Sequence, residues 1–91
     1  MEKVRKHFIF YGYVQGVGFR YRAYRAAESR GITGWVRNCW DGSVEMEAEG
    51  NPLDIEDMLV ALEKNQWASI ESIREKEIPL KNSSSFSIRD Y

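Results

Sequence analysis

The fold is decided by residues 7–20, which have the sequence HFIFYGYVQGVGFR. From His7 to Val14 the residues are aromatic or β-branched apart from Gly12, a composition typical of a β-strand. The two glycines of the next segment, Gln15–Gly18, predict a loop. This loop leads into Tyr21 to Arg30, whose alanines and arginines favour a helix. A strand, a glycine-rich loop and a helix therefore begin the predicted fold.

A hairpin of two strands is predicted after this helix. Gly31 is a natural C-cap, and Ile32 to Asn38 then predicts the second strand. The pair Asp41-Gly42 is a strong turn signal, and Ser43 to Glu49 returns as the third strand, with apolar and polar residues alternating. The alternation predicts one face packed on a core and one solvated face. The residues expected on the solvated face include Glu45, Glu47 and Glu49.

The second half of the chain predicts one more helix and two more strands. Asn51-Pro52 supplies a suitable cap and first turn, and apolar residues then recur at helical spacing as far as about Lys64. Ile70 to Ile78 predicts a fourth strand. A polar turn follows at residues 82–85, and the apolar side chains within residues 86–88 predict a short terminal strand.

This order of elements predicts an α+β protein with the ferredoxin-like (βαββαβ) arrangement, an antiparallel sheet with two helices on one face. We expect one domain over residues 1–91. In this topology the first two strands run parallel on either side of the third, so their carboxyl ends share one edge of the sheet. The glycine loop and Asn38 are therefore expected to meet at that edge.

Composition and charge exclude several classes of function. The chain has 91 residues and a formal net charge of -1, so no overall field attracts nucleic acid or an anionic membrane. One cysteine, Cys39, and one histidine, His7, cannot form an intrachain disulfide or a cysteine and histidine zinc site. No apolar run has the length of a signal peptide or a membrane span. We expect a cytoplasmic monomer without metal, cofactor, nucleic-acid partner or membrane partner.

The glycine loop is suited to bind a phosphate group. Its consecutive backbone N–H groups can point toward one site, and the N-terminus of the following helix adds partial positive charge. The guanidinium of Arg20 can grip two phosphate oxygens in a planar fork. The loop lacks the signatures of nucleoside triphosphate and dinucleotide sites. The predicted phosphate-binding residues are Gln15, Gly16, Val17, Gly18, Phe19 and Arg20.

Asn38 limits the chemistry that such a site can perform. Its uncharged amide can hold a water molecule but cannot act as a strong base. An acyl phosphate, a mixed anhydride with a good carboxylate leaving group, needs only a positioned water and neutralised phosphate charge. Taken alone, Asn38 is better explained as the residue that closes its strand into the turn. Together with Arg20 it forms a candidate catalytic pair.

Two segments resemble the signature segments of the acylphosphatase family: residues 12–20, GYVQGVGFR, and residues 34–38, GWVRN. The likeness continues through DGSVE at residues 41–45 and covers nearly the whole chain. The resemblance implies hydrolysis of the carboxyl-phosphate bond of an acyl phosphate to carboxylate and inorganic phosphate, without metal or covalent intermediate. It also implies that Arg20 binds the phosphate and that Asn38 positions the water.

Two other classes of function stay open at this point. One is a module that binds acyl or carbamoyl phosphate without turnover, like the related domain of hydrogenase-maturation carbamoyltransferases. The other is an RNA-recognition domain, which has the same element order and would use Ile9, Tyr11 and Tyr13 to stack bases. The glutamates of the third strand would repel the phosphates of RNA.

His7 lies early in its strand, far from the loop, and Cys39 lacks an evident histidine partner, so neither is assigned to catalysis.

Overall fold

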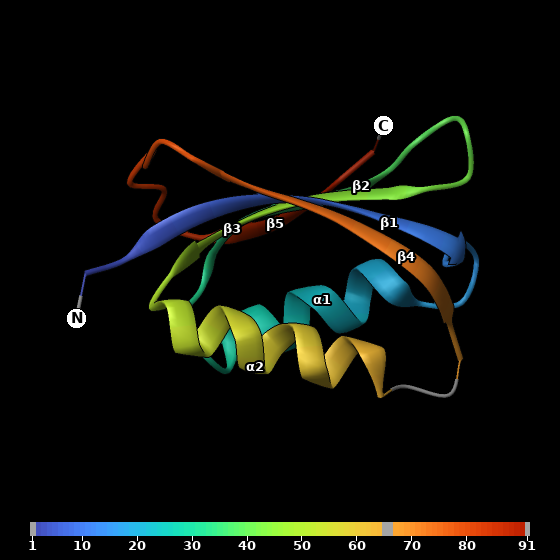
Figure 1. Ribbon diagram of the computed structural model, residues 1–91, viewed down its shortest axis with the longest axis horizontal. Helices are drawn as coiled ribbons and strands as arrows, with labels where there is room; N and C mark the ends of the chain where they lie inside the picture. Colours follow the sequence, from blue (N-terminus) through green and yellow to red (C-terminus); the bar gives the residue numbers. More distant parts are fainter. Residues whose placement is uncertain (1, 65–66, 91) are drawn as a thin grey trace.

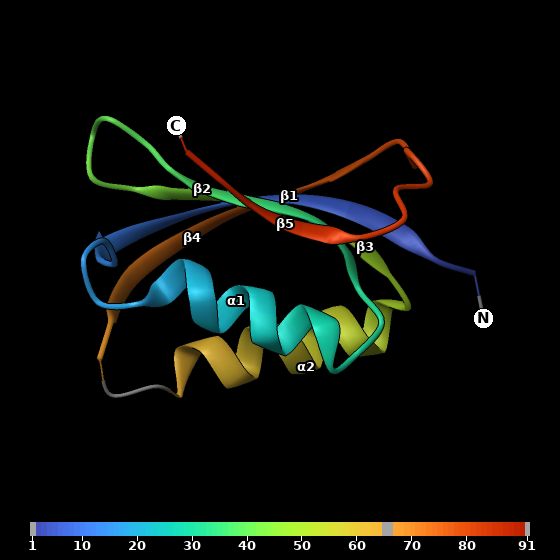
Figure 2. The same cartoon turned by 180° about the vertical axis from the view of Figure 1, so that it is seen from behind.

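A five-stranded sheet carries both helices on one face, as the computed structural model shows in two opposite views (Figure 1, Figure 2). The structure describes residues 2–64 and 67–90. Its elements are β1 (Val4–Tyr13), α1 (Phe19–Glu28), β2 (Thr33–Asn38), β3 (Val44–Gly50), α2 (Pro52–Glu63), β4 (Ser69–Ile78) and β5 (Phe86–Arg89).

The strand order of the sheet is β4-β1-β3-β2-β5. Strand β3 lies between β1 and β2 and is antiparallel to both, so β1 and β2 run parallel and end at the same edge. Strand β4 is antiparallel to β1 on one side, and the short β5 is parallel to β2 on the other. The predicted ferredoxin-like arrangement is confirmed, and β5 extends it beyond β2.

Helix α1 begins at Phe19, two residues before its predicted start. The Phe19 side chain is buried, and its ring centroid lies 5.0 Å from that of Phe10. Core packing thus draws Phe19 into the helix, although the helix-forming alanines come later. The helix ends at Glu28, and Ser29 is the residue that flanks it. Gly31 has a φ of 67° and closes the helix end as predicted, because the N–H groups of Gly31 and Ile32 donate back to the carbonyl oxygens of Glu28 and Ala27 at 3.4 and 3.0 Å.

The core lies between the two helices and the inner face of the sheet. Alternate residues of each central strand face the helices, as the period-two patterns predicted. Helix α2 begins at the predicted cap, because the side chain of Asn51 accepts a hydrogen bond from the N–H of Leu53 at 2.9 Å. Large buried side chains of the core include Phe8, Phe10, Val36, Met46, Ile55 and Met58.

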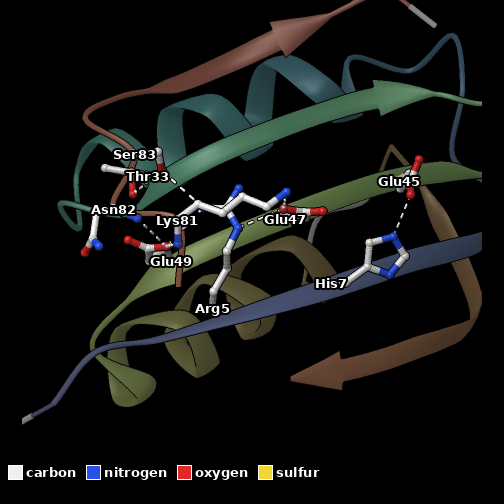
Figure 3. A network of polar contacts seen from close by, with 9 residues as sticks. All are labelled: Arg5, His7, Thr33, Glu45, Glu47, Glu49, Lys81, Asn82 and Ser83. Carbon is white, nitrogen blue, oxygen red and sulfur yellow. Dashed lines mark hydrogen bonds and ion pairs between the residues drawn. The ribbon is translucent and has the colours of Figure 1, made fainter. Parts of the chain in front are cut away.

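The outer face of the sheet differs from the sequence prediction. Glu47 and Glu49 are 8% and 2% exposed rather than solvated. Buried Arg5 donates through Nε to Glu47 at 2.8 Å and through Nη1 to Glu49 at 3.1 Å (Figure 3). The segment between β4 and β5 adds to this network, because the N–H groups of Lys81 and Asn82 donate to Glu49 at 2.8 and 3.3 Å. These contacts across distant segments hold the two carboxylates away from water.

Candidate active site

The glycine loop between β1 and α1 owes its shape to two left-handed residues. Gly16 and Gly18 have φ angles of 73° and 79°, a region that other residues rarely enter. A Cβ at either position would meet no atom within 4 Å, so backbone conformation rather than lack of space calls for glycine. Gly18 is the N-cap of α1, whose first turn has neither a side-chain cap nor an acidic residue. The first N–H groups of this helix are therefore open to an anion.

Gln15 braces this loop against the β2–β3 hairpin. Its side-chain Nε2 donates to the carbonyl oxygens of Cys39 at 2.7 Å and Ser43 at 2.8 Å. The hairpin is also closed by Asp41, whose Oδ1 accepts from the hydroxyl of Ser43 at 2.5 Å and from its N–H at 3.0 Å. These two hydrogen bonds hold the pKa of Asp41 below its ordinary value. Sequence reasoning assigned Gln15 a backbone role and missed this side-chain contact.

Arg20 reaches from the first turn of α1 to the end of β5. Its Nη1 donates to the backbone carbonyl of Arg89 at 3.3 Å and lies 3.9 Å from Oδ1 of Asp90. The Arg20 side chain is 33% exposed. Its guanidinium makes no other hydrogen bond with residues 2–64 or 67–90, so donors remain that can bind an oxyanion.

Asn38 is the last residue of β2 and lies opposite Val44 of β3. Because side chains alternate along a strand, Asn38 shares the inner face of β2 with buried Val36. Its side chain is half-buried and forms no hydrogen bond with the part of the chain that the structure describes. The amide can therefore donate to and accept from a ligand or a water molecule.

A pocket of about 190 Å³ contains both predicted catalytic residues. The predicted site residues among its lining are Gly16, Gly18, Phe19, Arg20 and Asn38. Gln15 and Val17 do not line it, because Gln15 points to the hairpin and Val17 packs against the hydrophobic core. The topology thus unites the loop with the end of β2, as expected from the shared edge of the sheet.

Three further residues line the pocket that sequence reasoning did not single out. They are Val14, Tyr21 and Ile88. Val14 and Tyr21 flank the glycine loop, so their nearness in sequence was a usable signal. Ile88 lies beside Val36 in the parallel pairing of β5 with β2. Nothing in the local sequence indicates this pairing, so Ile88 could not be found.

Other places and groups are less suited to this chemistry. A larger cavity, of about 390 Å³ between the helices, is lined in part by Arg22 and Leu62 but contains neither the glycine loop nor Asn38. His7 hydrogen-bonds to Glu45 on the outer face of the sheet. Over the described ranges, no three His, Cys, Asp or Glu side chains are grouped so that they could hold a metal ion. No described helix has the length and apolar character needed to cross a membrane.

Comparison with known proteins assigns the family. The family model described as acylphosphatase matches residues 6–88. The chain belongs to the acylphosphatase family. It is 41% identical over 78 residues to the acylphosphatase of Bifidobacterium longum, with 85% of this chain and 80% of that protein covered. It is 37% identical over 90 residues to the acylphosphatase of Moorella thermoacetica, with 98% and 97% covered.

Solved structures support the same family assignment. The crystal structure of acylphosphatase from Bacillus subtilis matches with a TM-score of 0.89 and 34% identity, covering 94% of this chain and 98% of that one. Full-length HypF in its phosphate- and nucleotide-bound form matches with a TM-score of 0.87 and 26% identity, covering 97% of this chain and 12% of that chain. The ferredoxin-like fold and the assignment as an acylphosphatase-type hydrolase are thereby confirmed.

Proposed function

We propose that this acylphosphatase-family chain hydrolyses the carboxyl-phosphate bond of acyl phosphates in the pocket between the glycine loop and the end of β2. The products are a carboxylate and inorganic phosphate. The observation that carries the proposal is that Arg20 and Asn38 line one pocket with Gly16 and Gly18, at the N-terminus of α1. All these residues belong to one chain, which supports the further proposal that the active species is a monomer.

In this proposal the phosphate group lies against the loop. Backbone N–H groups of the loop and of the first helical turn donate to its oxygens, with the helix dipole favouring negative charge. The Arg20 guanidinium donates to the phosphate and neutralises charge that would repel an incoming water. The same contacts stabilise the transition state as the phosphorus bond to the carboxylate oxygen lengthens.

Asn38 holds the attacking water in this mechanism. The described lining of the pocket contains no carboxylate and no imidazole that could serve as a general base. The water proton therefore passes to a phosphate oxygen of the substrate as the new P–O bond forms. The carboxylate leaves with the electron pair of the broken bond, and it needs no proton from the protein because it is a weak base. The scheme uses neither a metal ion nor a covalent intermediate.

The decisive experiment is hydrolysis of benzoyl phosphate by the purified protein in EDTA. Arg20→Ala is expected to lower kcat/KM by about a hundredfold or more, because it removes a charged stabiliser of the transition state. Asn38→Ala is expected to lower kcat more than it raises KM. Arg74→Ala is the matched control, because Arg74 is exposed and belongs to β4. Circular dichroism spectra identical to the wild type would show that each variant is folded.

Two results would contradict the proposal. If the well-folded wild type showed no turnover although phosphate protected it from thermal unfolding, the chain would be a phosphate-binding module without catalysis. If turnover disappeared in EDTA and returned with added magnesium, the mechanism would depend on a metal ion.

A further inference from the structure

A second polar groove, of about 390 Å³, lies on the outer face of the sheet. It is bordered by β2, by β5 and by the segment that joins β4 to β5. Trp35 and Ser87 lie side by side here in the β2–β5 register. The linings of this groove and of the candidate active site share no residue. The groove is therefore a separate surface of the molecule.

Two of the three cations that line the groove are neutralised by carboxylates. Arg5 donates to both Glu47 and Glu49, as described above. Nζ of Lys81 lies 3.1 Å from Oε1 of Glu47, and Figure 3 shows the network from close by. Arg5 and Lys81 thus line one side of the groove, and carboxylates already balance most of their positive charge.

Arg89 is the third cation, and its charge is not matched. Its guanidinium lies over the ring of Trp35, 4.6 Å from the ring centroid. It forms no ion pair with any residue in the ranges 2–64 and 67–90. The residue beside it in the register is Arg37, whose own guanidinium is bound to Glu45 at 2.6 Å. Glu45 thus matches the charge of Arg37, and Arg89 is left as the cation of the groove that has no carboxylate partner among the described residues.

Hydroxyl groups converge on the same groove. Ser84, Ser85 and Ser87 line it, and their hydroxyls make no hydrogen bond within the described residues. The backbone beneath them is fixed, because the N–H of Gly34 donates to the carbonyl of Ser85 at 2.9 Å. Ser83 adds a further anchor through its hydroxyl, which donates to that of Thr33 at 2.9 Å. The segment that carries these serines is thus anchored to β2 at Ser83 and Ser85, and the hydroxyls of Ser84, Ser85 and Ser87 are available to donate to a ligand.

We propose that this groove is a second anion site, which binds the phosphate group of a small phosphorylated compound. The Arg89 guanidinium would supply the charge, and the hydroxyls of Ser84, Ser85 and Ser87 would donate to the phosphate oxygens. The groove has no counterpart of Asn38 to position water, so the site binds without hydrolysis. This inference does not depend on the activity proposed for the catalytic pocket.

The test is an NMR titration of the nitrogen-15-labelled protein with inorganic phosphate, at constant ionic strength maintained with sodium chloride. The amides of Ser84, Ser85 and Ser87 and the indole N–H of Trp35 report on the groove. The amide of Gly16 reports separately on the catalytic pocket. We expect the groove signals to shift and saturate, including in Arg20→Ala, in which the catalytic pocket has lost its own arginine.

Three variants of the outer face make the result decisive. Arg89→Gln is expected to weaken phosphate binding at the groove about tenfold, because a charge-assisted contact is lost. Ser87→Ala removes one hydroxyl from an exposed position. It is expected to weaken phosphate binding at the groove a few-fold, about the effect of losing one neutral hydrogen bond. Arg74→Gln is the control, because Arg74 also lies on the outer face but outside the groove.

Several outcomes would overturn the proposal. The groove signals would shift without saturating if phosphate acted only as bulk salt. If the groove signals only reported binding at the catalytic pocket, they would titrate with the same midpoint phosphate concentration as the Gly16 amide. Their shifts would then be absent in Arg20→Ala. Equal affinities in wild type, Arg89→Gln and Ser87→Ala would show that these side chains do not hold the anion. Because Gly16 is followed in the same spectra, failure at the groove is distinguishable from failure at the catalytic pocket.

Discussion

The guanidinium of Arg20 and the backbone carbonyl of Arg89 are joined by a hydrogen bond of 3.3 Å, which links the first turn of α1 to the last strand of the sheet. Strand β5 reaches this position through its parallel pairing with β2, in which Ile88 lies beside Val36. The orientation of Arg20 therefore depends on a strand near the other end of the chain. The carboxylate of Asp90 lies next to the same guanidinium, at 3.9 Å.

Asp90→Asn is expected to lower KM for benzoyl phosphate by up to about threefold, with kcat unchanged. The substitution removes a negative charge that competes with phosphate for Arg20, but an exposed ion pair is weak and screened by salt. Steady-state kinetics at low and high ionic strength would measure the effect, which should shrink as salt is added. Glu56→Gln, at an exposed position of α2, is the control. A KM that rises in Asp90→Asn would contradict the interpretation.

Arg20→Lys is expected to lower kcat/KM by about tenfold, less than Arg20→Ala does. Lysine keeps the positive charge, but its ammonium cannot present two parallel N–H groups to the phosphate or reproduce the fixed fork of a guanidinium. The activities of the two variants, measured in parallel, separate the contribution of charge from that of geometry. Arg74→Lys, on β4, should retain wild-type activity. Wild-type activity in Arg20→Lys would show that the fork has no role.

Gln15→Ala is expected to reduce both the stability of the fold and the turnover of benzoyl phosphate. Two hydrogen bonds from Nε2 to the hairpin would be lost, which lowers the free energy of unfolding by about 1–3 kcal/mol. The loop would also be less well fixed relative to Asn38, and small displacements in a site are costly to catalysis. Urea unfolding and benzoyl phosphate kinetics measure the two effects.

Gln15→Glu tests the two hydrogen bonds from Nε2 while keeping the size of the side chain. A carboxylate of the same shape has no N–H to donate and would face the carbonyl oxygens of Cys39 and Ser43. We therefore expect it to be at least as harmful as alanine. Full stability and activity in both variants would show that the brace is dispensable.

Local patterns were sufficient to predict the main elements of the fold and to select the candidate residues Arg20 and Asn38, which line one pocket. The alternation around Met46 predicted the central strand, and Asn51 predicted the start of α2, because both signals depend on neighbours in sequence. The meeting of Arg20 with Asn38 could also be predicted, since the order of elements places their segments at one edge of the sheet.

Contacts between distant segments could not be predicted in this way. Glu49 looks like a solvated strand residue until Arg5 and the segment containing Lys81 are placed against it. The brace from Gln15 likewise depends on carbonyl groups that become neighbours only after folding. Ile88 lines the pocket because β5 pairs with β2 at one edge of the sheet. The four residues of β5 do not indicate by themselves which strand they will pair with.

Gly34→Ala is expected to destabilise the fold severely, by more than about 3 kcal/mol. Gly34 has a φ of 137°, and a Cβ there would lie 1.9 Å from the backbone carbonyl oxygen of Glu47. The central strands would have to separate to accept it. Gly42→Ala is the matched control, because its φ of 92° is also unfavourable but its Cβ would meet nothing within 4 Å. Urea unfolding should rank the two variants in that order, and equal losses would contradict the steric argument.

The stability of the fold is expected to fall as the pH is lowered below about 5. Burial raises the pKa of Glu49, but hydrogen bonds from the N–H of Lys81 and from Arg5 and Lys3 outweigh burial, so the net pKa lies below its ordinary value of 4.5. A carboxyl with a lowered pKa in the folded state binds its proton more readily when unfolded. Its contribution is therefore complete above the ordinary pKa and is lost as the pH falls through the lower, folded value. The pKa values of Glu45 and Glu47 are lowered too, which gives the same sign.

Glu49→Gln tests this origin of the pH dependence. At neutral pH it is expected to lower the free energy of unfolding by roughly 2–4 kcal/mol, because a buried charge partner of Arg5 is removed. From about pH 5 to about pH 3 its stability should decline less steeply than that of the wild type, since one of the responsible carboxyls is gone. Urea unfolding across this range would measure both slopes, with exposed Glu2→Gln as the control. Identical slopes in the wild type and in Glu49→Gln would mean that the buried network does not set the acid sensitivity of the fold.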